Sequence, residues 1–200
     1  ASPKRSDHSD FRSTRWCLVL LFGVACFQND CVLLILLLRR GGPCELWKTK
    51  CIPKIKVFGR LLLSDRLNTR NMLKRRHYNI GDNHDCILCG QHIEETLEHL
   101  FFGCSISTEC WDTLGIVWQQ GGTSLSKISM MKDTWGRPLF MEVFLLAAWS
   151  IWKERNNKHF RGISPSKSSW LARLRDDLSL LRYRVGEKLQ PFLSSFVNSI

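Results

Sequence analysis

Residues 84–104 read H-D-C-I-L-C-G-Q-H-I-E-E-T-L-E-H-L-F-F-G-C, and this stretch decides the fold. Two residues separate Cys86 from Cys89, nine separate Cys89 from His99, and four separate His99 from Cys104. A Cys-x2-Cys pair forms a knuckle in which both thiolates reach one ion, and a second pair from a following element closes the tetrahedron. We therefore predict one zinc ion bound by Cys86, Cys89, His99 and Cys104.

The predicted ion is structural, because three thiolates and one imidazole leave no coordination position for water. We expect residues 94–102 to form a short helix that carries His99. Gly103 is expected to supply the permissive turn that brings Cys104 back to the ion.

The cysteine count also favours metal binding. The chain has nine cysteines, an odd number, so a complete set of disulfides within the chain is excluded. Four of them crowd together with three histidines, which predicts a reducing compartment and hence an intracellular protein, nuclear or cytoplasmic. His84, His92 and Cys110 are the alternative ligands, although we interpret Cys110 as a buried packing residue of the next helix.

The length of 200 residues is enough to bury a core without disulfides, and the composition is close to that of globular proteins. The formal charge of +11 is unevenly distributed. Residues 45–79 carry ten basic and two acidic side chains, whereas residues 80–110 carry six acidic side chains and no Lys or Arg. A basic surface of this kind indicates a polyanionic partner.

Two short helices are expected in the basic segment, residues 45–79. One follows Pro53 with an apolar face around Phe58, and the other follows the N-cap Thr69 and ends near Arg76, with a turn at 64–68. The cations of these helices have two equally good explanations. They bind nucleic acid, or they form a solvated polar surface that binds nothing. The candidate phosphate-binding residues are Lys54, Lys56, Arg60, Arg66, Arg70, Lys74, Arg75 and Arg76.

The first 44 residues are hydrophobic and support more than one interpretation. Two apolar runs within 17–38 are interrupted by Gln28, Asn29 and Asp30. Neither run alone spans a bilayer, and inserting them as one span gives a free energy of about zero. A membrane span and a pair of buried elements are therefore equally favoured. The chain starts with Ala, which we interpret as a fragment of a longer reading frame.

The C-terminal half is expected to be helical. Residues 139–160 show a broad apolar face and end before Gly162, and a second helix from Ser164 to about Leu189 would pack against it antiparallel. The basic residues at the end of the first helix suit its dipole. The predicted fold is thus mainly α, with a small zinc-stabilised lobe flanked by short basic helices and a C-terminal antiparallel helical pair.

Several motifs outside the zinc ligands carry a family resemblance. They are W-K-T-K, P-K-I-K-V-F, R-L-N-T-R-N-M-L-K-R-R, C-I-L-C-G, E-E-T-L-E-H-L-F-F-G-C and W-S-I-W-K-E-R-N-N-K-H-F. Over roughly residues 45–160, the chain resembles the reverse-transcriptase zinc-binding domain of plant LINE-type (non-LTR) retrotransposons and the segment that follows it. The resemblance implies the same four ligands and a module, C-terminal to a polymerase, that contacts nucleic acid. Gly59 departs from the family, which usually has a large aromatic residue there, and this departure is expected to loosen the packing of the first basic helix.

We accordingly divide the chain into a hydrophobic segment (1–44), a zinc-binding domain (45–115), a linker (116–137) and a helical region (138–200). No enzymatic activity is expected, because a polymerase needs a metal-binding aspartate pair after an aromatic residue. The doublet Asp176-Asp177 lacks that aromatic and lies in a helical pattern.

The predicted function is non-catalytic binding of RNA or DNA. The first alternative is a zinc-stabilised protein-interaction adaptor that uses the acidic lobe and exposed tryptophans. The others are a membrane-tethered fragment anchored through 17–38 and a decayed element product without current function.

Overall fold

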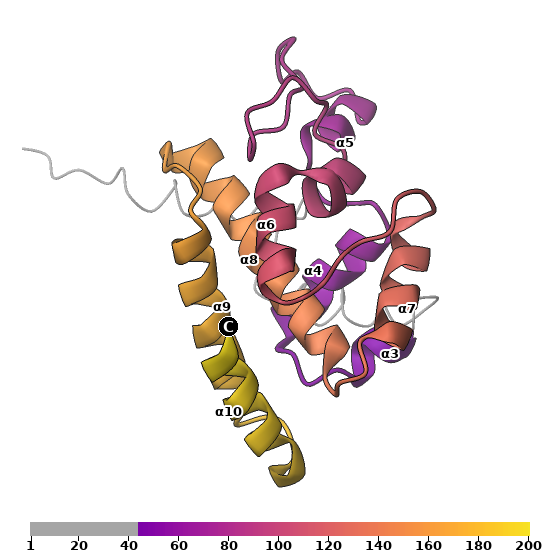
Figure 1. Ribbon diagram of the computed structural model, residues 1–200. Helices are drawn as coiled ribbons and strands as arrows, with labels where there is room; N and C mark the ends of the chain where they lie inside the picture. Colours follow the sequence, from indigo (N-terminus) through magenta and orange to yellow (C-terminus); the bar gives the residue numbers. More distant parts are fainter. Residues whose placement is uncertain (1–43) are drawn as a thin grey trace, which may run out of the picture. The chain divides into compact units, whose positions relative to one another are not determined.

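The computed structural model describes residues 44–200, so the hydrophobic segment 17–38 lies outside the described residues (Figure 1). The described part is helical and has no strand, which confirms the predicted mainly α fold. None of its helices is both long and apolar enough to cross a bilayer. The elements are α3 (Cys44–Lys48), α4 (Pro53–Leu63), α5 (Arg70–Arg75), the π-helical turn η1 (His99–Gly103), α6 (Ser105–Thr113), α7 (Ser124–Thr134), α8 (Phe140–Arg161), α9 (Lys167–Leu181), the 3-10 turn η2 (Glu187–Leu189) and α10 (Gln190–Ser199).

Helix α8 lies at the centre and contacts α4, α6 and α9 (Figure 1). Its aromatic side chains reach three different elements. Trp149 packs edge-on against Phe58 of α4 at 5.1 Å between ring centroids, and Phe144 stacks on Trp111 of α6 at 5.6 Å. Trp152 stacks at 6.5 Å on Phe101 of η1. Burial of this aromatic core supplies much of the free energy of folding.

The same core corrects one expectation. Every tryptophan in the described part of the chain is buried or half-buried, so the exposed tryptophans of the adaptor hypothesis are absent there. Indole rings carry large apolar areas, and five of the seven described tryptophans are buried in the core, three of them on α6 and α8.

Helix α4 begins at Pro53, as expected, and buries Ile55, Phe58 and Leu62. The expected loosening at Gly59 is wrong. A Cβ atom at Gly59 would lie 2.6 Å from Leu145 Cδ2 and 2.9 Å from Leu46 Cδ1. The glycine therefore lets α4 approach its neighbours closely, and the space that an aromatic residue would need is already filled.

The prediction of two helices in the C-terminal half is correct in outline and wrong in one boundary. Helix α8 ends at Arg161, and its C-cap Gly162 adopts a left-handed conformation at φ +66°. Helix α9 ends at Leu181 rather than near Leu189, and α10 follows it with Pro191 in its first turn. Proline fits the first turn of a helix, so Pro191 is tolerated at the start of α10, which packs against α9.

Two further sequence-based expectations can be compared with the fold. The stretch 116–137, expected to be a linker, contains helix α7, which starts at a capping box formed by Thr123 and Ser126.

The doublet Asp176-Asp177 lies on α9, where Asp177 pairs with Lys153 at 3.1 Å. This is the helix-face position expected for it.

Candidate metal centre

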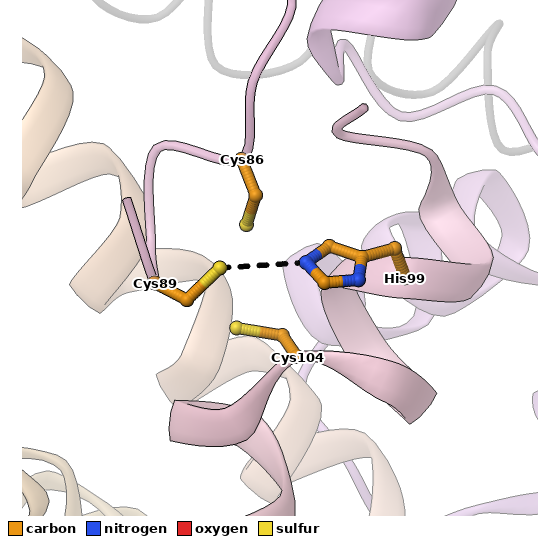
Figure 2. Close-up of side chains that lie close together, drawn as sticks. All are labelled: Cys86, Cys89, His99 and Cys104. Carbon is orange, nitrogen blue, oxygen red and sulfur yellow. Dashed lines mark hydrogen bonds between the residues drawn. The ribbon is translucent and has the colours of Figure 1, made fainter. Parts of the chain in front are cut away.

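Four predicted ligands converge at one point of the structure. The donor atoms of Cys86, Cys89, His99 and Cys104 all lie within 4.8 Å of one another (Figure 2). Cys89 Sγ lies 3.5 Å from His99 Nε2. Zinc–sulfur bonds of about 2.3 Å in a tetrahedron place donor atoms about 3.7 Å apart, so these residues fit one zinc ion.

The first two ligands come from a turn. The backbone N–H of Cys86 donates to Ile93 O at 2.7 Å, and that of Gly90 donates to Cys86 O at 2.9 Å. Gly90 adopts φ +69°, a conformation that glycine takes without strain. These bonds close the knuckle so that both thiol groups face the same side.

His99 begins η1 and Cys104 directly follows it, so the short helix predicted at 94–102 is present but starts later and is partly π-helical. Glu94 forms an isolated bridge with Asp85, and the helical turn starts only at Leu97. The backbone N–H of Cys104 donates to His99 O at 2.6 Å, closing a π-type turn that brings both ligands to one side.

The role predicted for Gly103 is also wrong. Gly103 is the last residue of η1 and does not adopt a left-handed conformation. A Cβ atom there would lie 3.8 Å from His99 Nδ1, an ordinary contact. The wide π turn itself returns Cys104 to the site, so no special backbone conformation is needed at residue 103.

Cys104 lies at the N-cap of α6. A hydrogen bond with Cys86 lowers the pKa of Cys104 to about 5, and the backbone N–H groups of Ser107 and Ile106 act in the same direction. The same bond, together with burial, raises the pKa of Cys86. Zinc binds cysteine as the thiolate, so an ion bound here would displace the remaining thiol protons.

The alternative ligands lie outside this cluster. His92 is exposed, and its Nδ1 lies 2.8 Å from Asp85 Oδ2. Cys110 is buried on α6, and burial raises its pKa to about 12, in agreement with its predicted packing role.

Glu95 organises the lobe around the metal centre, which we call the zinc lobe (residues 84–104). Its carboxylate is fully buried and accepts from the backbone N–H groups of Arg70 and Ile87, both at 3.0 Å. Arg155 of α8 donates to the same carboxylate from Nη2 at 2.7 Å and from Nε at 3.2 Å. One side chain thus joins α5, the cysteine knuckle and α8.

The sequence did not predict this role of Arg155. Its charge was explained by a favourable interaction with the helix dipole. Arg155 is only 3% exposed, and Lys158, one turn further along α8, donates to Leu88 O at 3.2 Å. The W-K-E-R-N motif contains Arg155 but does not indicate which residue it pairs with, because Glu95 is 60 residues away in the sequence.

The eight candidate phosphate-binding residues do not form one group. Lys54, Arg66, Lys74, Arg75 and Arg76 are exposed, whereas Lys56, Arg60 and Arg70 are half-buried. Lys54 and Lys56 lie in the first turn of α4. Arg70, Lys74 and Arg75 lie on α5, which follows the other end of α4, and Arg76 is the C-cap of α5.

Acidic groups pair with two of these cations, which the sequence did not predict. Arg75 pairs with Asp65 at 2.5 Å and Lys74 with Glu94 at 3.4 Å, both at exposed positions. Arg76 donates to the amide oxygen of Asn68 at 3.3 Å, and Arg70 to Asn83 Oδ1 and Asp85 O.

Comparison with known protein families gives a match that covers the metal centre. Residues 43–111 match the family described as zinc-binding in reverse transcriptase. No curated protein and no solved structure matches the chain. The matched segment contains all four donors of the cluster, so the predicted cofactor, one structural zinc ion, agrees with both the family and the geometry. The match is to the zinc-binding part of a reverse transcriptase and not to its catalytic domain.

Proposed function

We propose that this chain is a non-catalytic zinc-binding module derived from a plant LINE-type reverse transcriptase, and that it binds RNA or DNA inside the cell, in the nucleus or cytoplasm. The metal has no free coordination position in a Cys3His shell, so its part is structural. Its role is to hold the zinc lobe in the shape that presents α5 to the nucleic acid.

The observation that carries this proposal is the attachment of α5 to the zinc lobe. Helix α5 has six residues, far fewer than an isolated helix needs to be stable in water. Its first turn is capped by Thr69, and the backbone N–H groups of Arg70 and Asn71 donate to the side chain and the backbone oxygen of Glu95. The lobe therefore supplies the order that α5 lacks.

The exposed end of α5 has the chemistry that nucleic acids require. We define the α5 surface as Lys74, Arg75, Arg76 and Tyr78. The three cations are exposed, and Tyr78 is 62% exposed in the following loop. Lys and Arg neutralise phosphates, and an exposed aromatic ring stacks on unpaired bases.

The ion pairs of this surface do not prevent binding. The pairs Arg75–Asp65 and Lys74–Glu94 are solvent-exposed, and pairs of this kind contribute about 0–1 kcal/mol. A row of phosphates attracts several cations at once and releases condensed counterions, so it competes well with single carboxylates. We expect binding with low sequence selectivity and a strong dependence on salt.

The test is fluorescence anisotropy with labelled RNA and DNA oligonucleotides across a salt series. The triple variant K74A/R75A/R76A should bind more weakly, and the slope of log affinity against log salt should fall by about 2–3. The matched control R137A/R182A/K188A removes three exposed cations elsewhere and should leave the slope unchanged. Equal slopes for wild type and the K74A/R75A/R76A variant would contradict the proposal.

The rival proposal is a protein-interaction adaptor. It is favoured by exposed apolar side chains along the α9–α10 pair, where Leu180 is 64% and Tyr183 is 77% exposed and both line a groove. A wild-type chain that binds neither RNA nor DNA at low salt would favour this rival. Detergent partitioning of the full chain tests the membrane-tethered fragment, and a decayed element product would fail all of these tests.

A further inference from the structure

A basic hollow lies at the junction of α3 and α4, separate from the zinc lobe. It is shallow and open, with a volume of about 630 Å³. Its wall joins residues far apart in the sequence, because Arg184 comes from the turn after α9. The lining residues are Trp47, Lys48, Thr49, Lys50, Cys51, Lys56 and Arg184.

Four of these side chains are cations, and three of them have no partner among the described residues. Within residues 44–200, the side chains of Lys48, Lys50 and Arg184 make no ion pair and no hydrogen bond. Lys56 donates from Nζ to Trp47 O at 2.9 Å. Placing like charges together without counterions costs free energy, and a bound anion would recover it.

Glu142 lies beside the hollow but is not one of its lining residues. Glu142 of α8 is 7% exposed, and its Oε1 accepts from the backbone N–H of Lys50 at 3.0 Å. Burial raises the pKa of the Cys51 thiol to about 12, so that group is neutral at physiological pH. The lining residues include four cations and no carboxylate, so the wall of the hollow is positively charged.

Lys50, Lys56 and Arg184 line the same hollow, so their positive charges repel one another. Partial burial lowers the pKa of Lys56, and the charges of Lys50 and Arg184 act in the same direction. A bound anion would reverse this effect and raise the pKa of Lys56.

From these contacts we infer that the hollow is a binding site for a phosphate group. An arginine fork and several ammonium groups around one space match the charge and the acceptor oxygens of phosphate. The inference does not depend on the α5 surface. Helix α4 has eleven residues and is about 16 Å long, and the hollow and α5 lie beyond its opposite ends.

The indole N–H of Trp47 provides a local readout. It is buried and has no hydrogen-bond partner within the described residues, although Trp47 lines the hollow. Its NMR signal, assigned with the variant Trp47→Phe, should shift when an anion enters. Inorganic phosphate would be titrated into the full-length protein at constant ionic strength, with chloride as the balancing anion.

A saturable shift that chloride does not produce is the expected result. The double variant K50A/R184A should weaken phosphate binding by about tenfold or more, because it removes two charge-assisted contacts. The variant K50R/R184K, which keeps both charges, should still bind and serves as the control for folding. The variant K74A/R75A/R76A should bind phosphate like wild type, so failure of the α5 proposal would not affect this test.

A DNA oligonucleotide then identifies the source of the phosphate. If it displaces inorganic phosphate from the Trp47 signal, the hollow binds the nucleic-acid backbone. If it does not, the ligand is a free phosphate or a small phosphate ester. The inference is overturned if neither probe gives a saturable shift, or if K50A/R184A binds phosphate as wild type does.

Discussion

Glu95 connects the zinc lobe to the rest of the molecule through four donors on three elements. A buried carboxylate is tolerated only when it is paired and hydrogen-bonded, and Arg155 supplies the countercharge. The local sequence around either residue does not reveal the pair. The metal ligands differ in this respect, because their types and spacing within 19 residues were enough to predict them.

Replacing Arg155 by Met should destabilise the protein strongly. The substitution keeps most of the side-chain volume but leaves Glu95 buried without its countercharge, at a cost of about 3–5 kcal/mol. Urea denaturation followed by tryptophan fluorescence measures the free energy of unfolding. The control Lys153→Met breaks the partly exposed pair with Asp177 on the same helix and should cost about 1 kcal/mol or less. Similar losses for the two variants would show that Glu95 does not depend on Arg155.

Replacing Gly59 by Phe, the kind of residue usual in the resembling family, should also destabilise this chain. Leu145 and Leu46 occupy the space beyond the missing Cβ, so the ring would overpack the core at a cost of about 1–3 kcal/mol or more. Thermal unfolding measured by circular dichroism detects the loss. Gly186→Phe is the control, since no atom lies within 4 Å of a Cβ at Gly186. If the Gly59→Phe protein were as stable as wild type, Leu145 and Leu46 would not restrict the space beside residue 59 and the explanation would be wrong.

At the scale of the elements, the sequence predicted the helix ends that a single local residue determines. Pro53 starts α4, Thr69 caps α5 and Gly162 ends α8, each as expected. The end of α9 at Leu181 and the π turn at His99 were missed. Hydrophobic periodicity predicts that a segment is helical, but it reports neither the residue at which packing ends a helix nor the hydrogen-bond pattern of a short turn.

Replacing Thr69 by Ala should loosen α5 without disturbing the metal. Thr69 Oγ1 accepts from the Met72 N–H, and loss of such a cap costs about 1 kcal/mol. Zinc content should remain one per chain, while affinity for an RNA or DNA oligonucleotide falls several-fold. Thr134→Ala removes an exposed hydroxyl from α7 and should change neither quantity. Unaltered affinity in Thr69→Ala would separate nucleic-acid binding from the order of α5.

At the scale of the whole molecule, the folded unit extends beyond the family match. Residues 43–111 match the family, but Trp152 and Arg155 of α8 contact Phe101 and Glu95 inside that segment. All the described residues belong to one compact unit. The boundaries proposed from the sequence at 115 and 137 remain a prediction.

A chain truncated after residue 115 should therefore not fold on its own. It would expose the aromatic faces of α4, η1 and α6 that α8 covers, and it would leave Glu95 without Arg155. Extending the chain to residue 162 should restore dispersed amide signals in a heteronuclear NMR spectrum. A well-dispersed spectrum from the shorter chain would show that α8 is dispensable.

The central claim is that one zinc ion organises the lobe that holds α5. Native mass spectrometry of the reduced protein combined with hydrogen exchange, before and after chelation, tests it most directly. We expect one zinc per chain. Its removal should abolish amide protection in residues 69–78 and 84–104 while the middle of α8 remains protected. A protein without stoichiometric zinc, or one whose α5 amides stay equally protected after chelation, would contradict the account.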